Sequence, residues 1–278
     1  MFGHREVSID RARSSARRAR RACALMLTGF TWGCFGAPVP VVPMPSIRYE
    51  SAQGHGHSGA IVLLMPGRRS RAGDFESNGF VAAARNQGID ADLVAVDAHL
   101  GYYLDGGYQS LPVRIEEDVV RPLGAHIGRG LWLVGTSLGA MGSLAYAKHY
   151  PERVSGLLLL GPYLGEDAVL AEIQAAGGLE AWTPSGKAGY DYEIRTWVWL
   201  KQFADGRAKP PCRLYIGYGK RDSYRRASDI LAAVLPADHV LVSDEGGHDW
   251  DTWLGLWRRF LAENGRQLQP SAEAVAAP

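Results

Sequence analysis

Short apolar runs alternate with longer stretches of mixed polarity along most of this chain. The runs are bounded by glycine or polar residues and lie at 60–65, 91–96, 131–134, 156–160, 213–216 and 239–242. Continuous apolar runs of this length predict strands that are buried on both faces of a parallel sheet. Helices are predicted between them at 75–86, 113–126, 140–149 and 250–263. The alternation therefore predicts an α/β fold, with a mostly parallel twisted sheet and helices on both faces.

A glycine–serine motif joins one predicted strand to the helix that follows it. The run at 131–134 leads into Gly135-Thr136-Ser137-Leu138-Gly139, and the helix-forming stretch 140–149 comes next. In such a turn the serine takes a strained backbone conformation, while the two glycines let strand and helix approach. The serine then lies at a helix N-terminus, where free N–H groups can stabilise an oxyanion. Ser137 is therefore a candidate nucleophile, and a chance turn is the alternative.

Partners for this serine are expected in the loops that follow other strands. In a parallel sheet with right-handed crossovers, these loops meet at one carboxyl edge, where ligands bind. Asp222 lies just past the run at 213–216, and His248 follows the run at 239–242 after two glycines. The order along the chain is serine, acid, histidine, which is one of the known orders of a catalytic triad.

Other acidic and histidine side chains compete for these roles. Asp167 follows the run at 156–160 and is the second choice for the acid, whereas Asp244 and Asp249 are too close to His248 in sequence to point at it. His99 follows the run at 91–96 and is more consistent with a structural histidine than with a member of a triad. His55 and His57 lack accompanying cysteine or carboxylate ligands, so a glycine-rich turn is predicted rather than a metal site.

From about Ala60 to Phe260 the chain resembles the α/β-hydrolase-fold serine hydrolases of the esterase and lipase type. The serine motif, the Asp222 loop and the glycine-preceded His248 carry this resemblance. It implies that Ser137 attacks a carbonyl carbon, that His248 takes and returns the proton, and that Asp222 orients the imidazole.

The resemblance also implies an oxyanion hole, formed by the backbone N–H groups of Arg68 and Leu138. Pro66-Gly67 stands where the family often has His-Gly. The implied reaction is hydrolysis of a carboxylic ester through an acyl-enzyme intermediate. Thioesterases, lysophospholipases and peptidases share this machinery, and a non-catalytic binding protein on the same fold is a further alternative. The complete set of three side chains argues against the binding protein.

The regular alternation is interrupted at about 165–210. This stretch is rich in aromatic residues: Trp182, Tyr190, Tyr192, Trp197, Trp199 and Phe203. Related hydrolases carry an inserted lid at this place, so a short cap of one or two helices is expected. The cap is expected either to roof an apolar acyl or alcohol pocket or to use its rings to pack against the main domain.

The N-terminal residues 1–37 resemble a secretory signal peptide. Six arginines between positions 11 and 21 precede an uncharged run at 22–37 that ends in small residues. Export to the periplasm or the medium is expected, with lipid anchoring through Cys34 as the lesser alternative. The run is short for a membrane span, so no transmembrane span is expected in the mature form.

Beyond the signal, residues 38–59 are predicted as a lead-in with an edge strand near Ile47–Tyr49. Residues 60–265 are predicted as the catalytic domain with its cap, and 266–278 as a flexible tail. With 278 residues, 46% hydrophobic residues and a net charge of +1, the chain can bury one full core and has no basic excess for nucleic acid. Only Cys212 would remain in a soluble mature form, which excludes an internal disulfide. The expected partner is a small-molecule ester or lipid-like substrate, with neither cofactor nor metal.

Overall fold

The fold is described from a computed structural model, which covers residues 38–51, 60–104, 110–124, 130–185, 191–207 and 209–269. The strands are β1 (Ser46–Tyr49), β2 (Ile61–Met65), β3 (Asp92–Val96), β4 (Leu131–Thr136), β5 (Val154–Leu160), β6 (Arg213–Gly219) and β7 (Val240–Ser243). The α-helices are α2 (Asp74–Ser77), α3 (Phe80–Asn86), α4 (Leu100–Leu104), α5 (Ser110–Ile115), α6 (Leu138–His149), α7 (Asp167–Ala175), α8 (Asp191–Ala204), α9 (Arg225–Ala232) and α10 (Trp250–Asn264).

The strands form one mostly parallel sheet in the order β1-β3-β2-β4-β5-β6-β7. Only β1 is antiparallel within the described sheet; it pairs with β3 so that Ser46 lies opposite Val96. The central strands β2 and β4 are fully buried, as their continuous apolar sequences predict. The predicted α/β fold and the predicted edge strand near Ile47 are thus confirmed.

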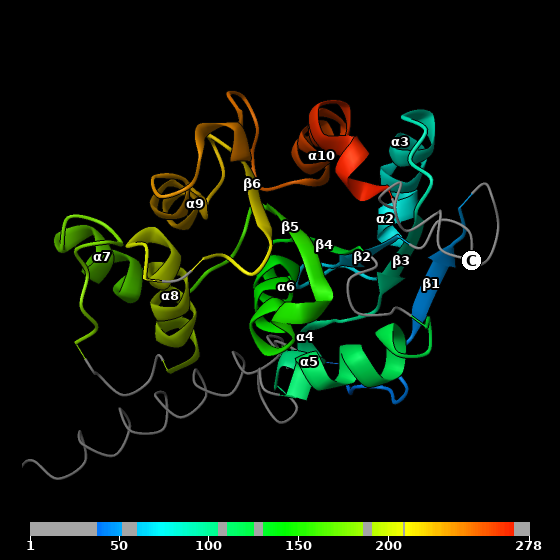
Figure 1. The fold of residues 1–278 in the computed structure, drawn as a ribbon, viewed down its shortest axis with the longest axis horizontal. Helices are drawn as coiled ribbons and strands as arrows, with labels where there is room; N and C mark the ends of the chain where they lie inside the picture. Colours follow the sequence, from blue (N-terminus) through cyan, green and yellow to red (C-terminus); the bar gives the residue numbers. More distant parts are fainter. Residues whose placement is uncertain are drawn as a thin grey trace, which may run out of the picture. The chain divides into compact units, whose positions relative to one another are not determined.

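Helices cover both faces of the sheet. In Figure 1, α3 and α10 lie on one side of the strands and α4, α5 and α6 on the other. Alternate side chains of each strand point into two separate cores. One core contains Leu63, Leu133 and Leu159 together with α4 to α9; the other contains Val62, Val134 and Leu160 together with α2, α3 and α10. None of the helices in the described ranges has the length and apolar character needed to cross a bilayer.

The structure departs from several of the predicted elements. The helix predicted at 75–86 is divided into α2 and α3, because Gly79 between them has a left-handed φ of 80°. The helix predicted at 113–126 begins earlier, at Ser110, and continues as a π-helical turn over Glu116–Val120. The tail predicted from 266 instead opens with a 3-10 turn, Gly265–Leu268, in which Leu268 is fully buried.

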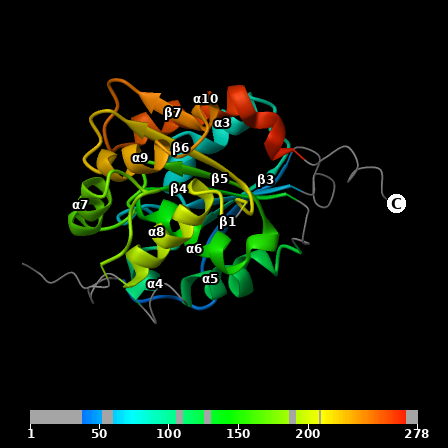
Figure 2. The same cartoon turned by 60° about the vertical axis from the view of Figure 1, so that its left-hand side comes forward.

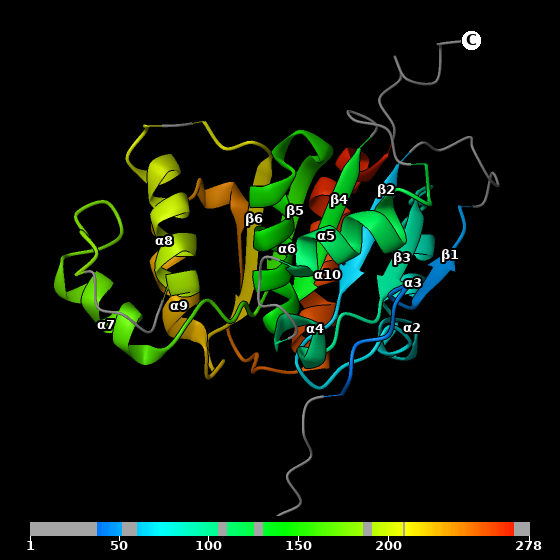
Figure 3. The ribbon, with the colours of Figure 1, turned by 90° about the horizontal axis from the view of Figure 1, so that it is seen from below.

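The segment between β5 and β6 contains α7 and α8, as expected for a short helical cap. Both helices lie near α9 and β6, away from the β1 end of the sheet (Figures 2 and 3). The α7–α8 insertion, as residues 165–210 are called below, contacts the main domain where α7 meets α9 and α8 meets α6. It is therefore packed on the sheet domain rather than separate from it.

Candidate active site

Ser137 occupies a sharp turn between β4 and α6. Its backbone has φ 51° and ψ −115°, and it is the one non-glycine residue with a positive φ in the described part of the chain. Such a conformation costs about 1–3 kcal/mol and persists only where the surroundings enforce it. The strained serine that the motif predicts is therefore present, at the N-terminus of a twelve-residue helix.

The two motif glycines make this turn possible. A Cβ on Gly135 would lie 2.5 Å from the carbonyl oxygen of Gly139, so any side chain there would separate β4 from the start of α6. A Cβ on Gly139 would overlap the carbonyl oxygen of Met65 at the end of β2. Both positions require glycine because backbone meets backbone at these points.

Ser137, His248 and Asp222 lie in an unbroken chain of hydrogen bonds. The imidazole Nδ1 of His248 is 2.9 Å from both carboxylate oxygens of Asp222, and its Nε2 is 2.9 Å from the Oγ of Ser137. Since a carboxylate only accepts, Nδ1–H donates to Asp222 and Nε2 is left to accept from the serine hydroxyl. The Asp222 side chain is fully buried, whereas the His248 side chain is 20% exposed.

Backbone hydrogen bonds tie the Asp222 loop to the His248 loop. Lys220 N–H donates to the Ser243 carbonyl and Arg221 N–H to the Gly246 carbonyl, each at 2.9 Å. Directly after His248, the Asp249 carboxylate accepts from Thr252 N–H at 2.8 Å and caps the N-terminus of α10. The histidine is thus fixed from both sides by the ends of neighbouring elements.

The expected oxyanion-hole loop lies next to the serine. A Cβ on Gly67 would be 3.3 Å from the Cβ of Ser137, which places the loop after β2 against the nucleophile. Among the described residues, the N–H groups of Arg68 and Leu138 have no hydrogen-bond acceptor. Two unpaired amides beside a nucleophile are what an oxyanion hole requires. The Arg68 side chain is exposed, in agreement with a solvated arginine.

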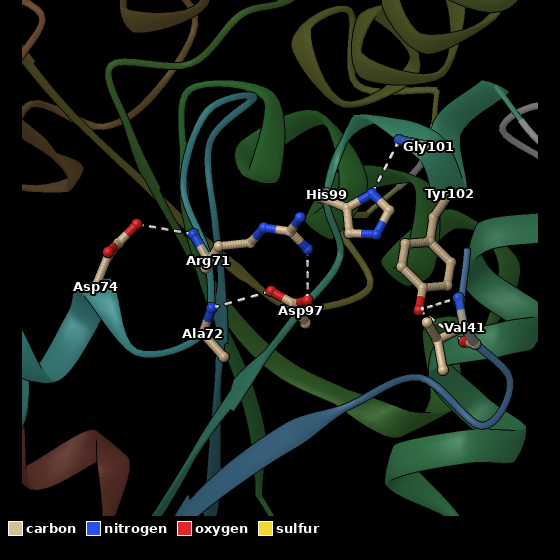
Figure 4. A network of polar contacts seen from close by, with 8 residues as sticks. All are labelled: Val41, Arg71, Ala72, Asp74, Asp97, His99, Gly101 and Tyr102. Carbon is tan, nitrogen blue, oxygen red and sulfur yellow. Dashed lines mark hydrogen bonds and ion pairs between the residues drawn. The ribbon is translucent and has the colours of Figure 1, made fainter. Parts of the chain in front are cut away.

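A polar network holds this loop to the end of β3 (Figure 4). The Asp97 carboxylate accepts from Arg71 Nη1 at 2.7 Å and from the backbone N–H of Ala72 at 3.3 Å. Arg71 N–H donates in turn to the Asp74 carboxylate at 2.8 Å. The loop that carries Arg68 is therefore anchored at its far end by charged side chains.

His99 belongs to the structure rather than to the triad, as predicted. It is 4% exposed, and its Nδ1 accepts from Gly101 N–H at 3.1 Å (Figure 4). Burial, followed by the nearby Arg71, lowers the pKa of His99 below its usual 6.5. The ring packs on Tyr102 with centroids 4.7 Å apart.

The competing acids contact other partners. Asp167, at the start of α7, has a side chain that is 95% exposed and lies 3.7 Å from Arg226. Asp244 is exposed and pairs with Lys220 at 2.6 Å. Asp249 is the helix cap described above. His55 and His57 lie outside the described residues. Asp222 is thus the carboxylate that His248 contacts.

The aromatic residues of the α7–α8 insertion divide into two groups. Trp182 and Trp197 are fully buried in the core shared with α6, and Trp197 Nε1 donates to the Leu164 carbonyl at 2.8 Å. Trp199 and Phe203 are partly exposed and stack edge to face. Tyr190 lies outside the described residues. A cleft of about 410 Å³ on the insertion is lined mainly by α7, by Ala168, Val169, Ala171, Glu172, Ala175, Ser185 and Ile194, and by none of the triad loops.

Several residues beside the triad were not predicted. Tyr163 N–H donates to the Ser137 carbonyl at 3.1 Å, and Tyr224 N–H donates to Asp222 Oδ1 at 2.7 Å. The centroid of the His248 ring lies 4.7 Å from the ring centroid of Tyr224 and 5.0 Å from that of Trp253. Tyr163 and Tyr224 each follow a predicted strand at the carboxyl edge, so the rule that found Asp222 also points to them.

Solved structures of hydrolases share this architecture. The chain superposes on the fluorophosphonate-binding serine hydrolase F of Staphylococcus aureus with a TM-score of 0.56 and 14% identity, covering 81% of this chain and 98% of that one. An S-formylglutathione hydrolase from Agrobacterium tumefaciens superposes with a TM-score of 0.55 and 16% identity, covering 81% of this chain and 90% of that one. An α/β-hydrolase enzyme from the metagenome of lagoon sediments at Mar Chica, Morocco, superposes with a TM-score of 0.53 and 16% identity, covering 83% of this chain and 99% of that one. The chain has the α/β-hydrolase fold.

Sequence comparisons add little to this fold assignment. No protein-family model matches the sequence. Proline iminopeptidase of Neisseria gonorrhoeae is 48% identical over 54 residues, which is 19% of this chain and 17% of that protein. The chain therefore matches less than a fifth of the length of this curated relative. The α/β-hydrolase fold explains why the triad loops meet, because its strands end at a common edge.

Proposed function

We propose that this protein is a serine hydrolase that cleaves a carboxylic ester through an acyl-enzyme intermediate. The observation that carries this proposal is the hydrogen-bonded series from Asp222 through His248 to Ser137, with each contact at 2.9 Å. The strained serine conformation and the two unpaired amides beside it support the same conclusion. A buried carboxylate, an oriented imidazole and an activated hydroxyl together form the machinery of acyl transfer.

The first half of the reaction transfers the acyl group to the enzyme. Ser137 Oγ attacks the carbonyl carbon of the ester while His248 Nε2 takes the hydroxyl proton. The carbonyl oxygen becomes an oxyanion, which accepts from the N–H groups of Leu138 and Arg68. His248 then gives the proton to the leaving alkoxide oxygen, the carbon–oxygen bond of the ester breaks, and the acyl group remains on Ser137.

The second half releases the acid. A water molecule gives its proton to His248 and attacks the acyl carbon, and the proton then returns to Ser137 Oγ as the bond to the enzyme breaks. The Asp222 carboxylate stabilises the imidazolium that forms in each half. Because its carboxylate is fully shielded from solvent, little water screens this charge from the imidazolium.

Hydrolysis of a p-nitrophenyl ester series from acetyl to palmitoyl tests the proposal. Turnover that Ser137→Ala abolishes is the expected result, and the preferred chain length would report the acyl pocket. Covalent labelling with a fluorophosphonate probe separates an enzyme from a binding protein. A folded protein that neither labels at Ser137 nor turns over any ester would contradict the proposal.

A peptidase is the second candidate, because the short sequence match is to a proline iminopeptidase. The same triad can cleave an amide, so the distinction depends on the substrate pocket. Proline p-nitroanilide, assayed beside the esters, decides between them. Thioester and lysophospholipid substrates test the remaining variants of this chemistry.

Export of the mature protein is proposed from residues 1–37, which lie outside the described residues. Their arginine-rich start and uncharged continuation support a cleaved signal. To test this, the full chain is expressed in a bacterium, and the mass of the protein is measured separately in the cytoplasm, the periplasm and the medium. A mass that begins near Ala37 is expected; an acylated form that Cys34→Ala abolishes would support a lipid anchor instead.

A further inference from the structure

Trp253 is a buried residue beside the triad whose indole N–H has no partner. It lies in the first turn of α10 and is 5% exposed. Its ring stands edge to face against the His248 imidazole, with centroids 5.0 Å apart and an interplanar angle of 87°. No hydrogen-bond acceptor for Nε1 is present among the described residues. A buried, unpaired N–H is destabilising, so an arrangement that retains one calls for an explanation.

Gly161, directly after β5, shows what this N–H faces. A Cβ on Gly161 would lie 2.7 Å from Trp253 Nε1, 2.7 Å from Asp222 Oδ2 and 3.3 Å from His248 Nδ1. The three polar atoms therefore border one small space above the Gly161 Cα. Gly161 also has a φ of 50°, which favours glycine. Because Gly161 has no side chain, the indole nitrogen and the carboxylate oxygen border the same space, each 2.7 Å from the position of that Cβ.

The two oxygens of Asp222 are unequally used. Oδ1 accepts from Tyr224 N–H at 2.7 Å and from His248 Nδ1 at 2.9 Å. Oδ2 accepts only from His248 Nδ1, also at 2.9 Å, among the described residues. A carboxylate oxygen has two lone pairs, so Oδ2 retains acceptor capacity on its buried side. The unpaired donor of Trp253 lies beside the acceptor that has room for it.

We propose that Trp253 is a positioning residue of the triad, whose indole N–H is held for Oδ2 of Asp222. This inference rests on the proposed function. The indole N–H would be a further donor at Oδ2, in addition to Tyr224 N–H and His248 Nδ1–H, and would restrain rotation of the carboxylate when His248 accepts the serine proton. The contact thus keeps the Asp222 charge aligned with the imidazolium at the moment it forms.

Trp253→Phe tests this proposal, because it keeps an aromatic ring against His248 and removes the N–H. We expect kcat for a p-nitrophenyl ester to fall about tenfold, KM to stay within about twofold and the melting temperature to change little. Trp257→Phe is the matched control on the same helix. Its N–H donates to the Phe80 carbonyl at 3.0 Å, remote from the triad, so this variant should lower the melting temperature and leave kcat unchanged.

A spectroscopic measurement tests the contact without any turnover. The indole N–H resonance of Trp253, assigned by its loss in Trp253→Phe, should move in Asp222→Asn. The Trp132 resonance is the internal reference: this ring is also buried with an unpaired N–H, but it packs against Tyr215 and Phe260. We expect the Trp253 signal to move and the Trp132 signal to stay.

The outcomes separate this proposal from the proposed function. If the wild-type protein hydrolyses esters and Trp253→Phe keeps its kcat, the positioning role is overturned. If the wild-type protein hydrolyses no ester, the proposed function fails, and the indole resonance alone decides the contact. A Trp253 signal that does not respond to Asp222→Asn overturns the contact in either case.

Discussion

The triad loops and the α7–α8 insertion are both connections that follow strands of the same sheet, yet they are held in different ways. At the triad the backbone makes the contacts: Gly135 and Gly139 allow strand and helix to touch, and the Asp222 loop donates two amide hydrogen bonds to carbonyls of the His248 loop. The insertion is held mainly by large apolar side chains, above all Trp182 and Trp197 in the core shared with α6. One region is positioned by polar geometry and the other by burial.

This difference separates activity from stability. Triad side chains are held mainly by hydrogen bonds at the edge of the sheet, so removing one should change the chemistry and leave the core intact. Buried tryptophans of the insertion contribute area removed from water, so their loss should weaken the fold. The first turn of α8 joins the two regions, since Tyr163, which contacts the Ser137 backbone, lies 3.4 Å from the Glu193 carboxylate. The predictions below test this separation.

The largest effect is expected at the nucleophile and its base. Ser137→Ala or His248→Ala should lower turnover by at least about a thousandfold, because the first change removes the nucleophilic hydroxyl and the second removes its general base. The melting temperature should stay close to that of the wild type. Ser143→Ala is a matched control on α6, where the hydroxyl donates to the Gly139 carbonyl at 2.9 Å. A large loss of folding in either triad variant would contradict the separation.

A large loss of stability is expected when a buried ring of the insertion is removed. Trp197→Ala should lower the free energy of unfolding by about 3–5 kcal/mol, since it leaves a cavity and frees the Leu164 carbonyl. Urea unfolding measures this loss. Trp199→Ala, which removes a partly exposed ring of the same helix, should cost on the order of 1 kcal/mol. Equal losses in both variants would argue against packing as the cause.

A smaller effect on activity is expected at the anchor of the oxyanion loop. Asp97→Ala removes the acceptor of both Arg71 and Ala72, so kcat should fall about tenfold as the Arg68 amide loses its fixed position. Glu263→Ala is a matched control, because it removes an exposed pair with Arg259. An unchanged kcat in Asp97→Ala would mean that the loop keeps its position without this anchor.

The smallest effect is a dependence of stability on pH at His99. The unfolded histidine binds its proton near pH 6.5, whereas burial and Arg71 lower the pKa of the folded one. Below pH 6.5 the unfolded state therefore binds more protons than the folded state. The free energy of unfolding then decreases as the pH is lowered, by at most about 1.4 kcal/mol per pH unit from this group. Urea unfolding between pH 7.5 and 5.5 should show this slope, and His99→Gln should reduce it. An identical slope in the variant would assign it to other groups.

The amino-acid sequence alone predicted the strands, a mostly parallel sheet and the three side chains that the structure joins by hydrogen bonds. Strands were predictable because a strand that is buried on both faces, such as the run at 156–160, has apolar residues at successive positions and no polar residue between them. The proximity of Ser137, Asp222 and His248 was predictable because a parallel sheet brings the carboxyl ends of its strands to one edge, independently of the conformation of the loops. The turn at Ser137 is also local, since glycines two residues away on each side permit it.

Only the tertiary structure decided which side chains meet across long distances in the chain. It separated Asp222 from the exposed Asp167, and it divided the predicted helix at Gly79. It also placed Trp182 and Trp197 in the core rather than around an open pocket. The placement of Trp253 Nε1 and Asp222 Oδ2 around Gly161 depends on α10, the loop after β6 and the end of β5, and on no local pattern. Periodicity reports which face of an element is buried, whereas the partner that covers that face depends on how the elements pack in three dimensions.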